Sequence, residues 1–107
     1  MTTNELIRAL DLKVFHAGED QEITTGFCGD LLSLVMGGAP SGSAWITVMT
    51  NVNVAAVAML CDMACVILSQ GKEPDENLLA RVKRENLTLL GTEENTYTVA
   101  VRLGSVL

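Results

Sequence analysis

Aromatic and basic residues are both scarce in this chain of 107 residues. Phe, Trp and Tyr make up only 4% of it, although 49% of the residues are hydrophobic, so the core must be built from Val, Leu, Ile, Ala and Met. Seven Lys and Arg residues are outnumbered by 13 Asp and Glu, which gives a net charge of −6. Because nucleic acids and anionic membrane surfaces are bound by clustered positive charge, the sequence predicts neither as a partner.

Cysteine is scarce too, and the three present, Cys28, Cys61 and Cys65, contain no CxxC pair. This argues against a disulfide framework and a structural zinc site, and it leaves one thiolate too few for a four-cysteine iron–sulfur cluster unless subunits share it. A GxxxxGKS or GxxxxGKT loop is missing as well, which excludes a P-loop nucleotide hydrolase. We therefore expect no metal and no bound cofactor.

Long apolar runs are also missing. Residues 54–68 are the most apolar stretch, but Asp62 interrupts them and they fall short of the ~20 residues that cross a bilayer. The N-terminus carries Asn4, Glu5 and Arg8 where a signal peptide would have a basic stretch followed by an apolar one. These features predict a cytoplasmic protein, and the length predicts one domain, residues 1–107.

Residues 27–37 are the part of the chain around which the rest is organised. They have the pattern of a short strand, a tight turn and the start of a helix. Asp30 stands where its carboxylate could cap that helix, and Leu31, Leu34 and Val35 recur at helical spacing, so we expect all three to face the core.

The rest of the chain repeats this alternation of strand and helix. Thr3 and Asp75 are expected to cap the helices that follow them, and Asp11 to end the first one. Residues 37–43 are rich in glycine and form either a turn or a phosphate cradle. The expected helices are 4–10, 54–60, 76–85 and 97–106, and the expected strands are 13–16, 22–24, 44–48, 65–68 and 87–90.

Strands that alternate with helices of this length require crossover connections, which place neighbouring strands parallel. The predicted fold class is therefore α/β: a compact three-layer sandwich with a mostly parallel sheet flanked by helices. Ligands of such sheets lie beyond the carboxyl ends of the strands. The polar residues expected there, our candidate ligand-binding residues, are Asp30, Ser33, Thr47, Thr50, Asn51, Asn53, Ser69 and Thr92.

Four segments in order, residues 29–36, 44–48, 53–58 and 71–75, resemble the DRTGG domain family. The segment that names the family is degenerate here, since Glu-Ile-Thr-Thr-Gly at residues 22–26 keeps only the Thr-Gly part. Asn51 occupies a position that is often histidine in similar proteins, and such a change could alter a ligand or metal site. The resemblance implies a fold similar to the N-terminal domain of HPr kinase/phosphorylase.

The resemblance also implies a role as a sensory or assembly module, with any chemistry carried by another part of the polypeptide. Similar single-domain proteins occur beside iron-only hydrogenase components, which implies a redox enzyme as a partner. No P-loop is present, so kinase activity does not follow from the fold.

Three functional hypotheses remain open. The first is a non-catalytic regulatory module that binds a small ligand, with a nucleotide or a phosphorylated compound among the candidates, and forms a homodimer or higher homo-oligomer. The second is an accessory subunit that binds a hydrogenase or another redox enzyme. The third is an enzyme subunit with Asp30 as general base and Thr47 or Thr50 positioning the substrate, although the sequence supplies no partner that would raise the pKa of Asp30. The lone His16 is expected to be a surface or hydrogen-bonded residue.

Overall fold

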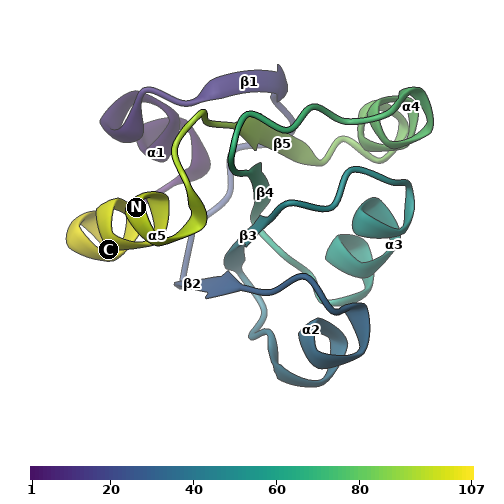
Figure 1. The fold of residues 1–107 in the computed structure, drawn as a ribbon, viewed down its shortest axis with the longest axis horizontal. Helices are drawn as coiled ribbons and strands as arrows, with labels where there is room; N and C mark the ends of the chain where they lie inside the picture. The colour runs from purple at the N-terminus through teal and green to yellow at the C-terminus, as the bar shows by residue number, and fades with distance from the viewer.

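A computed structural model describes residues 1–107, and it shows a five-stranded sheet in the order β1-β5-β4-β3-β2 (Figure 1). Strands β2 to β5 are parallel, and β1 returns antiparallel to β5. The strands are β1 (Lys13–His16), β2 (Thr25–Cys28), β3 (Ser43–Thr47), β4 (Cys65–Leu68) and β5 (Thr88–Gly91). The helices are α1 (Thr3–Leu10), α2 (Leu32–Gly38), α3 (Asn53–Leu60), α4 (Glu76–Glu85) and α5 (Thr96–Val106). The predicted α/β sandwich with a mostly parallel sheet is confirmed.

Helices cover both faces of the sheet, with α2, α3 and α4 on one side and α1 and α5 on the other (Figure 1). Successive side chains of a strand point to opposite faces, so Val66 and Leu68 in β4 join the first core and Cys65 and Ile67 the second. This explains why β3, β4 and β5 are buried at every position and consist of nearly unbroken apolar runs. None of the helices combines the length and the apolar character that a membrane span requires.

Outside α2, two of the three residues predicted to start or end a helix are confirmed. Asp75 caps α4 by accepting a hydrogen bond from the Leu78 N–H at 2.8 Å, and Asp11 ends α1 with φ +51°. The predicted cap Thr3 is wrong, because Thr2 caps α1 and forms a capping box with Glu5. Thr3 is buried instead, and its hydroxyl donates to Asp20 at 2.9 Å.

Helix α2 differs most from the expectation. Asp30 is not its cap, since the N-cap residue is Leu31 and no side chain caps the helix. Of the three residues expected in the core only Val35 is buried, while Leu31 is 59% and Leu34 68% exposed. The reason is position: α2 lies over β2, the last strand of the sheet, so a narrow stripe of α2 suffices to cover the sheet beneath it.

The strand predicted at residues 22–24 is also wrong. Glu22 forms only an isolated bridge with Thr2, and the paired strand β2 begins at Thr25. Of residues 37–43, Gly37 and Gly38 end α2 and Ser43 begins β3. The turn between them includes Gly42, which adopts φ +79° and whose N–H donates to the Asp62 carbonyl at 2.8 Å.

Candidate functional site

The carboxyl ends of the four parallel strands lie along one edge of the sheet, where the loops to α2, α3, α4 and α5 begin. The structure divides the predicted site residues between two places on this edge. Those that follow β2 and β3 bond mainly to one another and to the backbone. Of the two that follow β4 and β5, Thr92 lies beside a hollow, while Ser69 is buried with its hydroxyl 2.8 Å from that of Thr96.

Asp30 acts as a brace between the ends of β2 and β3. Its Oδ1 accepts hydrogen bonds from the Thr47 hydroxyl at 2.7 Å and from the Val48 N–H at 2.9 Å. The hydroxyl of Thr47, a residue with 1% exposure, in turn accepts from the Met49 N–H at 3.3 Å. The carboxylate that the sequence offered as helix cap or general base therefore satisfies buried polar groups of the neighbouring strand.

The other predicted residues near β3 also have local roles. The Asn51 side chain accepts from the Asn53 N–H at 2.9 Å and shapes the turn into α3, while the Thr50 carbonyl accepts from the Asp75 N–H at 3.0 Å. Ser33 is exposed on α2 and lines none of the hollows. No common cavity brings these side chains together.

A hollow of about 680 Å³ lies beyond β4 and β5, between the start of β1 and the side of α5. Thr92 is the one predicted site residue that lines it. Three of the seven basic residues of the chain gather here, Lys13, Lys72 and Arg102. The full lining is Leu10, Asp11, Lys13, Phe15, Gly71, Lys72, Glu73, Gly91, Thr92, Glu93, Glu94 and Arg102.

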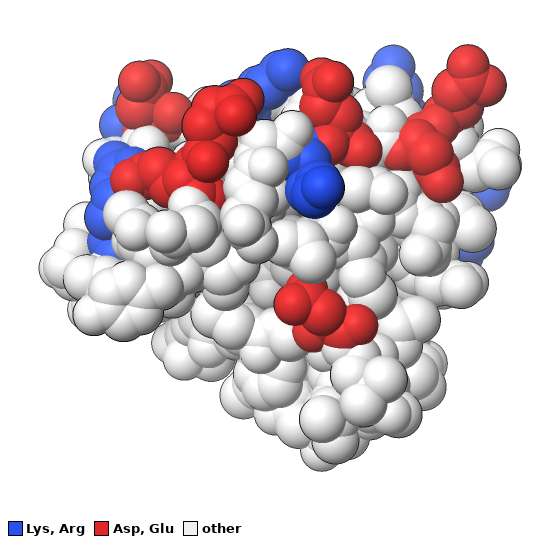
Figure 2. Space-filling view, viewed as in Figure 1, with Lys and Arg blue, Asp and Glu red and all other residues white.

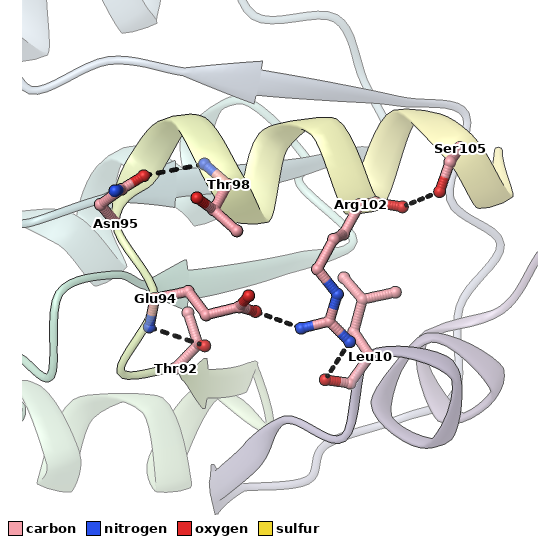
Figure 3. A network of polar contacts seen from close by, with 7 residues as sticks. All are labelled: Leu10, Thr92, Glu94, Asn95, Thr98, Arg102 and Ser105. Atoms are coloured by element: carbon pink, nitrogen blue, oxygen red, sulfur yellow. Dashed lines mark hydrogen bonds and ion pairs between the residues drawn. The ribbon is translucent and has the colours of Figure 1, made fainter.

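Arg102 holds one wall of this hollow in place (Figure 3). Its guanidinium pairs with the Glu94 carboxylate and also donates to the Leu10 carbonyl at 3.0 Å. The Glu94 N–H donates to the Thr92 hydroxyl at 3.2 Å, so the loop after β5 is shaped by the same group of residues. Arg102 thereby joins α5, the β5–α5 loop and the end of α1.

The two lysines are held less tightly. Lys13 forms an ion pair of 3.1 Å with Glu73 and lies 5.0 Å from the centroid of the Phe15 ring, and both partners of the pair are more than half exposed. Such a pair adds little stability because water screens it. Lys72 is exposed and forms no ion pair, so its ammonium group is available to an incoming anion, whereas Lys13 would have to exchange Glu73 for one.

The hollow lacks a thiol or imidazole nucleophile. Burial raises the pKa of the Cys65 thiol to about 12, and Cys65 packs within the core below α1 and α5. Partial burial, and to a lesser degree the nearby Asp30, raises the pKa of the Cys28 thiol. His16, expected to be a surface or hydrogen-bonded residue, is partly exposed at the end of β1, and its Nε2 is buried without a hydrogen-bond partner.

The three cations are far apart in the chain, which is why sequence reasoning missed them. The antiparallel return of β1 to β5 brings Lys13 to this edge, the β4–α4 loop supplies Lys72, and α5 supplies Arg102. No local motif connects these positions. Only the strand order could have predicted that they meet.

An α/β sandwich with a mostly parallel sheet and polar loops at its carboxyl edge is a broad architectural class that many unrelated domains share. The particular family is narrower: the DRTGG domain model matches residues 5–106, so the chain belongs to the DRTGG domain family. A search of curated protein sequences finds no match.

Among solved structures, the chain is similar to the CBS and DRTGG domains of the regulatory region of Clostridium perfringens pyrophosphatase, a structure complexed with the activator diadenosine tetraphosphate. The TM-score is 0.75 at 15% sequence identity, and the match covers 95% of this chain and 45% of the other. At this identity the likeness shows a shared fold. The chain spans less than half the length of that neighbour.

Proposed function

We propose that this chain is a non-catalytic regulatory module that binds a small phosphorylated ligand, such as a nucleotide, in the hollow beyond β4 and β5. One observation carries the proposal: three of the seven basic residues of an acidic chain lie around one hollow. The lining also holds four carboxylates, but two of them are already paired with Lys13 and Arg102, and Lys72 forms no ion pair. Phosphate oxygens are bound well by such cations. The carboxylates of the same lining, Glu73 and Glu93 among them, can accept hydrogen bonds from sugar hydroxyls.

Nucleotides are the first ligands to test because of the structural neighbour. It is a regulatory region bound to a dinucleotide activator, and its fold agrees with ours over nearly the whole chain. Because the DRTGG domain of that neighbour lies in a regulatory region, membership of the DRTGG family also supports a regulatory role. The candidate site accordingly narrows from the ends of all four parallel strands to those of β4 and β5.

The catalytic alternative has less support. Asp30 would have to give up two hydrogen bonds to serve as a base, and Thr47 is too buried to position a substrate. We further propose that the module acts in the cytoplasm as a homo-oligomer. Binding to a redox enzyme such as a hydrogenase is the second candidate role, and a large uncharged surface described below favours some protein contact.

The ligand proposal is tested by thermal unfolding with ATP, AMP, diadenosine tetraphosphate or inorganic phosphate added separately. A ligand at 100 times its Kd stabilises the folded state by ~2.7 kcal/mol, so a bound nucleotide raises the melting temperature by several degrees. Isothermal titration then compares Lys72→Ala, expected to weaken binding about tenfold, with Lys83→Ala on the exposed end of α4 as the matched control. No shift with any ligand at millimolar concentration, or equal loss in both variants, overturns the proposal.

A further inference from the structure

The two edge strands of the sheet are protected very differently. β1 carries Lys13, and its register with β5 shifts between Val14 and His16. Charged residues and irregular register are the usual devices that keep an edge strand from pairing with another chain. β2 has neither: it contains no charge and no proline, and its register with β3 is regular from Thr25 to Cys28.

The surface around β2 is uncharged as well. Between Glu22 and Asp62 the only charged residue is Asp30, and this stretch includes all of β2, α2, β3 and α3. Figure 2 shows the result: charges of both signs crowd the part of the surface over β1, β5 and α4, while the part over α2 and α3 is white except for an isolated acidic patch.

Exposed apolar side chains concentrate on the two helices that flank β2. Six of the nine large exposed ones belong to α2 with its cap or to α5 with its last residue, namely Leu31, Leu34, Met36, Tyr97, Val101 and Leu107. Between β2 and α5 lies a second hollow, of about 400 Å³, which reaches Ile46 in β3 and is lined mostly by apolar groups. An apolar surface of this kind around an open strand marks an interface.

We propose that β2 is the dimerisation strand: two copies of this chain pair antiparallel along their β2 edges and join their sheets into one. The proposal rests on the homo-oligomer in the proposed function and names its surface. A second copy fits for two reasons. Two chains of charge −6 repel one another least when they meet through an uncharged face, and this face offers a charged partner of another kind almost nothing to pair with.

The backbone fixes the register of such a pair. The Thr24 N–H donates to the Gly42 carbonyl at 2.9 Å, so the backbone N–H and C=O groups of Thr24 and of alternate residues after it point to β3. The N–H and C=O groups of Thr25 and Phe27 consequently point to the open edge. A two-fold axis at Gly26 pairs Thr25 with the partner's Phe27, and each of these residues exchanges both backbone hydrogen bonds with the other.

The side chains agree with this register. A Cβ on Gly26 would lie 2.7 Å from the Leu103 side chain, so the residue on the axis faces α5, and a larger residue there would have to displace Leu103. Thr24 and Cys28 line the hollow on that same side, and both are exposed. In the dimer Cys28 stands opposite the partner's Thr24 in a non-hydrogen-bonded pair, with Cα atoms about 4.5 Å apart.

That pair gives a direct test. Light scattering of the wild-type chain is expected to give twice 11.4 kDa at micromolar concentration. Under mild oxidation Thr24→Cys is expected to form a covalent dimer with the native Cys28, because about 4.5 Å lies within the Cα range of disulfides. The wild type and the double variant with Thr24→Cys and Cys28→Ser are the controls, since neither places two thiols opposite one another, and both are expected to stay uncrosslinked.

A charge placed on the uncharged surface around β2 should separate the two copies. Leu34→Glu, at a side chain that is 68% exposed, is expected to weaken the dimer at least tenfold, while Leu60→Glu, 69% exposed at the end of α3, leaves it intact. A monomeric wild type overturns the proposal, and so does a dimer that Thr24→Cys cannot crosslink. A monomer that still binds nucleotide overturns the dimer alone, and a crosslinked dimer that binds none overturns only the ligand proposal.

Discussion

The β1 and β2 ends of the same sheet meet solvent in opposite ways. Around β1 lie ion pairs, three cations and a polar hollow, and the exposed edge carries a lysine. Around β2 lie two helices with apolar outer faces and almost no charge. The difference indicates that the two ends suit different partners. Water and small ions can bind the polar groups around β1, whereas the apolar side chains around β2 are covered only by another apolar surface.

The largest loss of stability is expected when the core of the uncharged end is removed. Trp45 is 0% exposed in β3, and its indole N–H donates to the Gly29 carbonyl at 2.9 Å. We expect Trp45→Ala to lower the free energy of unfolding by about 3–5 kcal/mol, because it leaves a large cavity. Lys13→Ala at the charged end is the control and should change it by less than about 0.5 kcal/mol. Urea titrations measure the free energy of unfolding of both variants, and similar losses would contradict the difference between the two ends.

A smaller effect is expected from the single charge within the uncharged end. Asp30→Ala removes the acceptor of the Thr47 hydroxyl and the Val48 N–H, and should cost about 2 kcal/mol of stability. Asp30→Asn keeps an acceptor oxygen and is expected to recover at least half of that loss. If both variants were as stable as the wild type by urea titration, Asp30 would not be a brace between the strands.

The smallest effect is expected from acid, and it falls on α1. The N–H of Thr2 bonds to the Glu5 carboxylate and lowers its pKa below 4.5, and the N–H of Asn4 lowers the pKa of Asp20 below 3.8. A lowered folded pKa stabilises the native state above the unfolded value and ceases to do so as the pH falls through the folded value.

Amide exchange at Thr2 and Asn4 should therefore speed up below about pH 4 relative to the rest of the protein, with little change in global stability since both carboxylates are exposed. Glu5→Gln keeps an acceptor but does not titrate, so it should flatten the response at Thr2. Unchanged protection of both amides down to pH 2 would count against this account.

The alternation of strands and helices was predictable from Phe27 onward because buried parallel strands such as residues 65–68 are apolar at every position. The role of Asp30 was not, since its partner Thr47 lies 17 residues away in the next strand. Nor could the sequence place Lys13 beside Lys72 and Arg102, because that neighbourhood depends on β1 lying next to β5. Local patterns predicted elements, and strand order decided which elements share a site.

Trp45 has one more consequence, because it is the only tryptophan in the chain. With no exposure to water, its emission should be blue-shifted in the native state and should move to longer wavelength on unfolding. Its ring belongs to the core below α2, α3 and α4, in the strand next to β2 and away from the polar hollow. The Trp45 emission therefore reports the packing of the uncharged end. A ligand that binds in the hollow at the other end is expected to leave this emission unchanged.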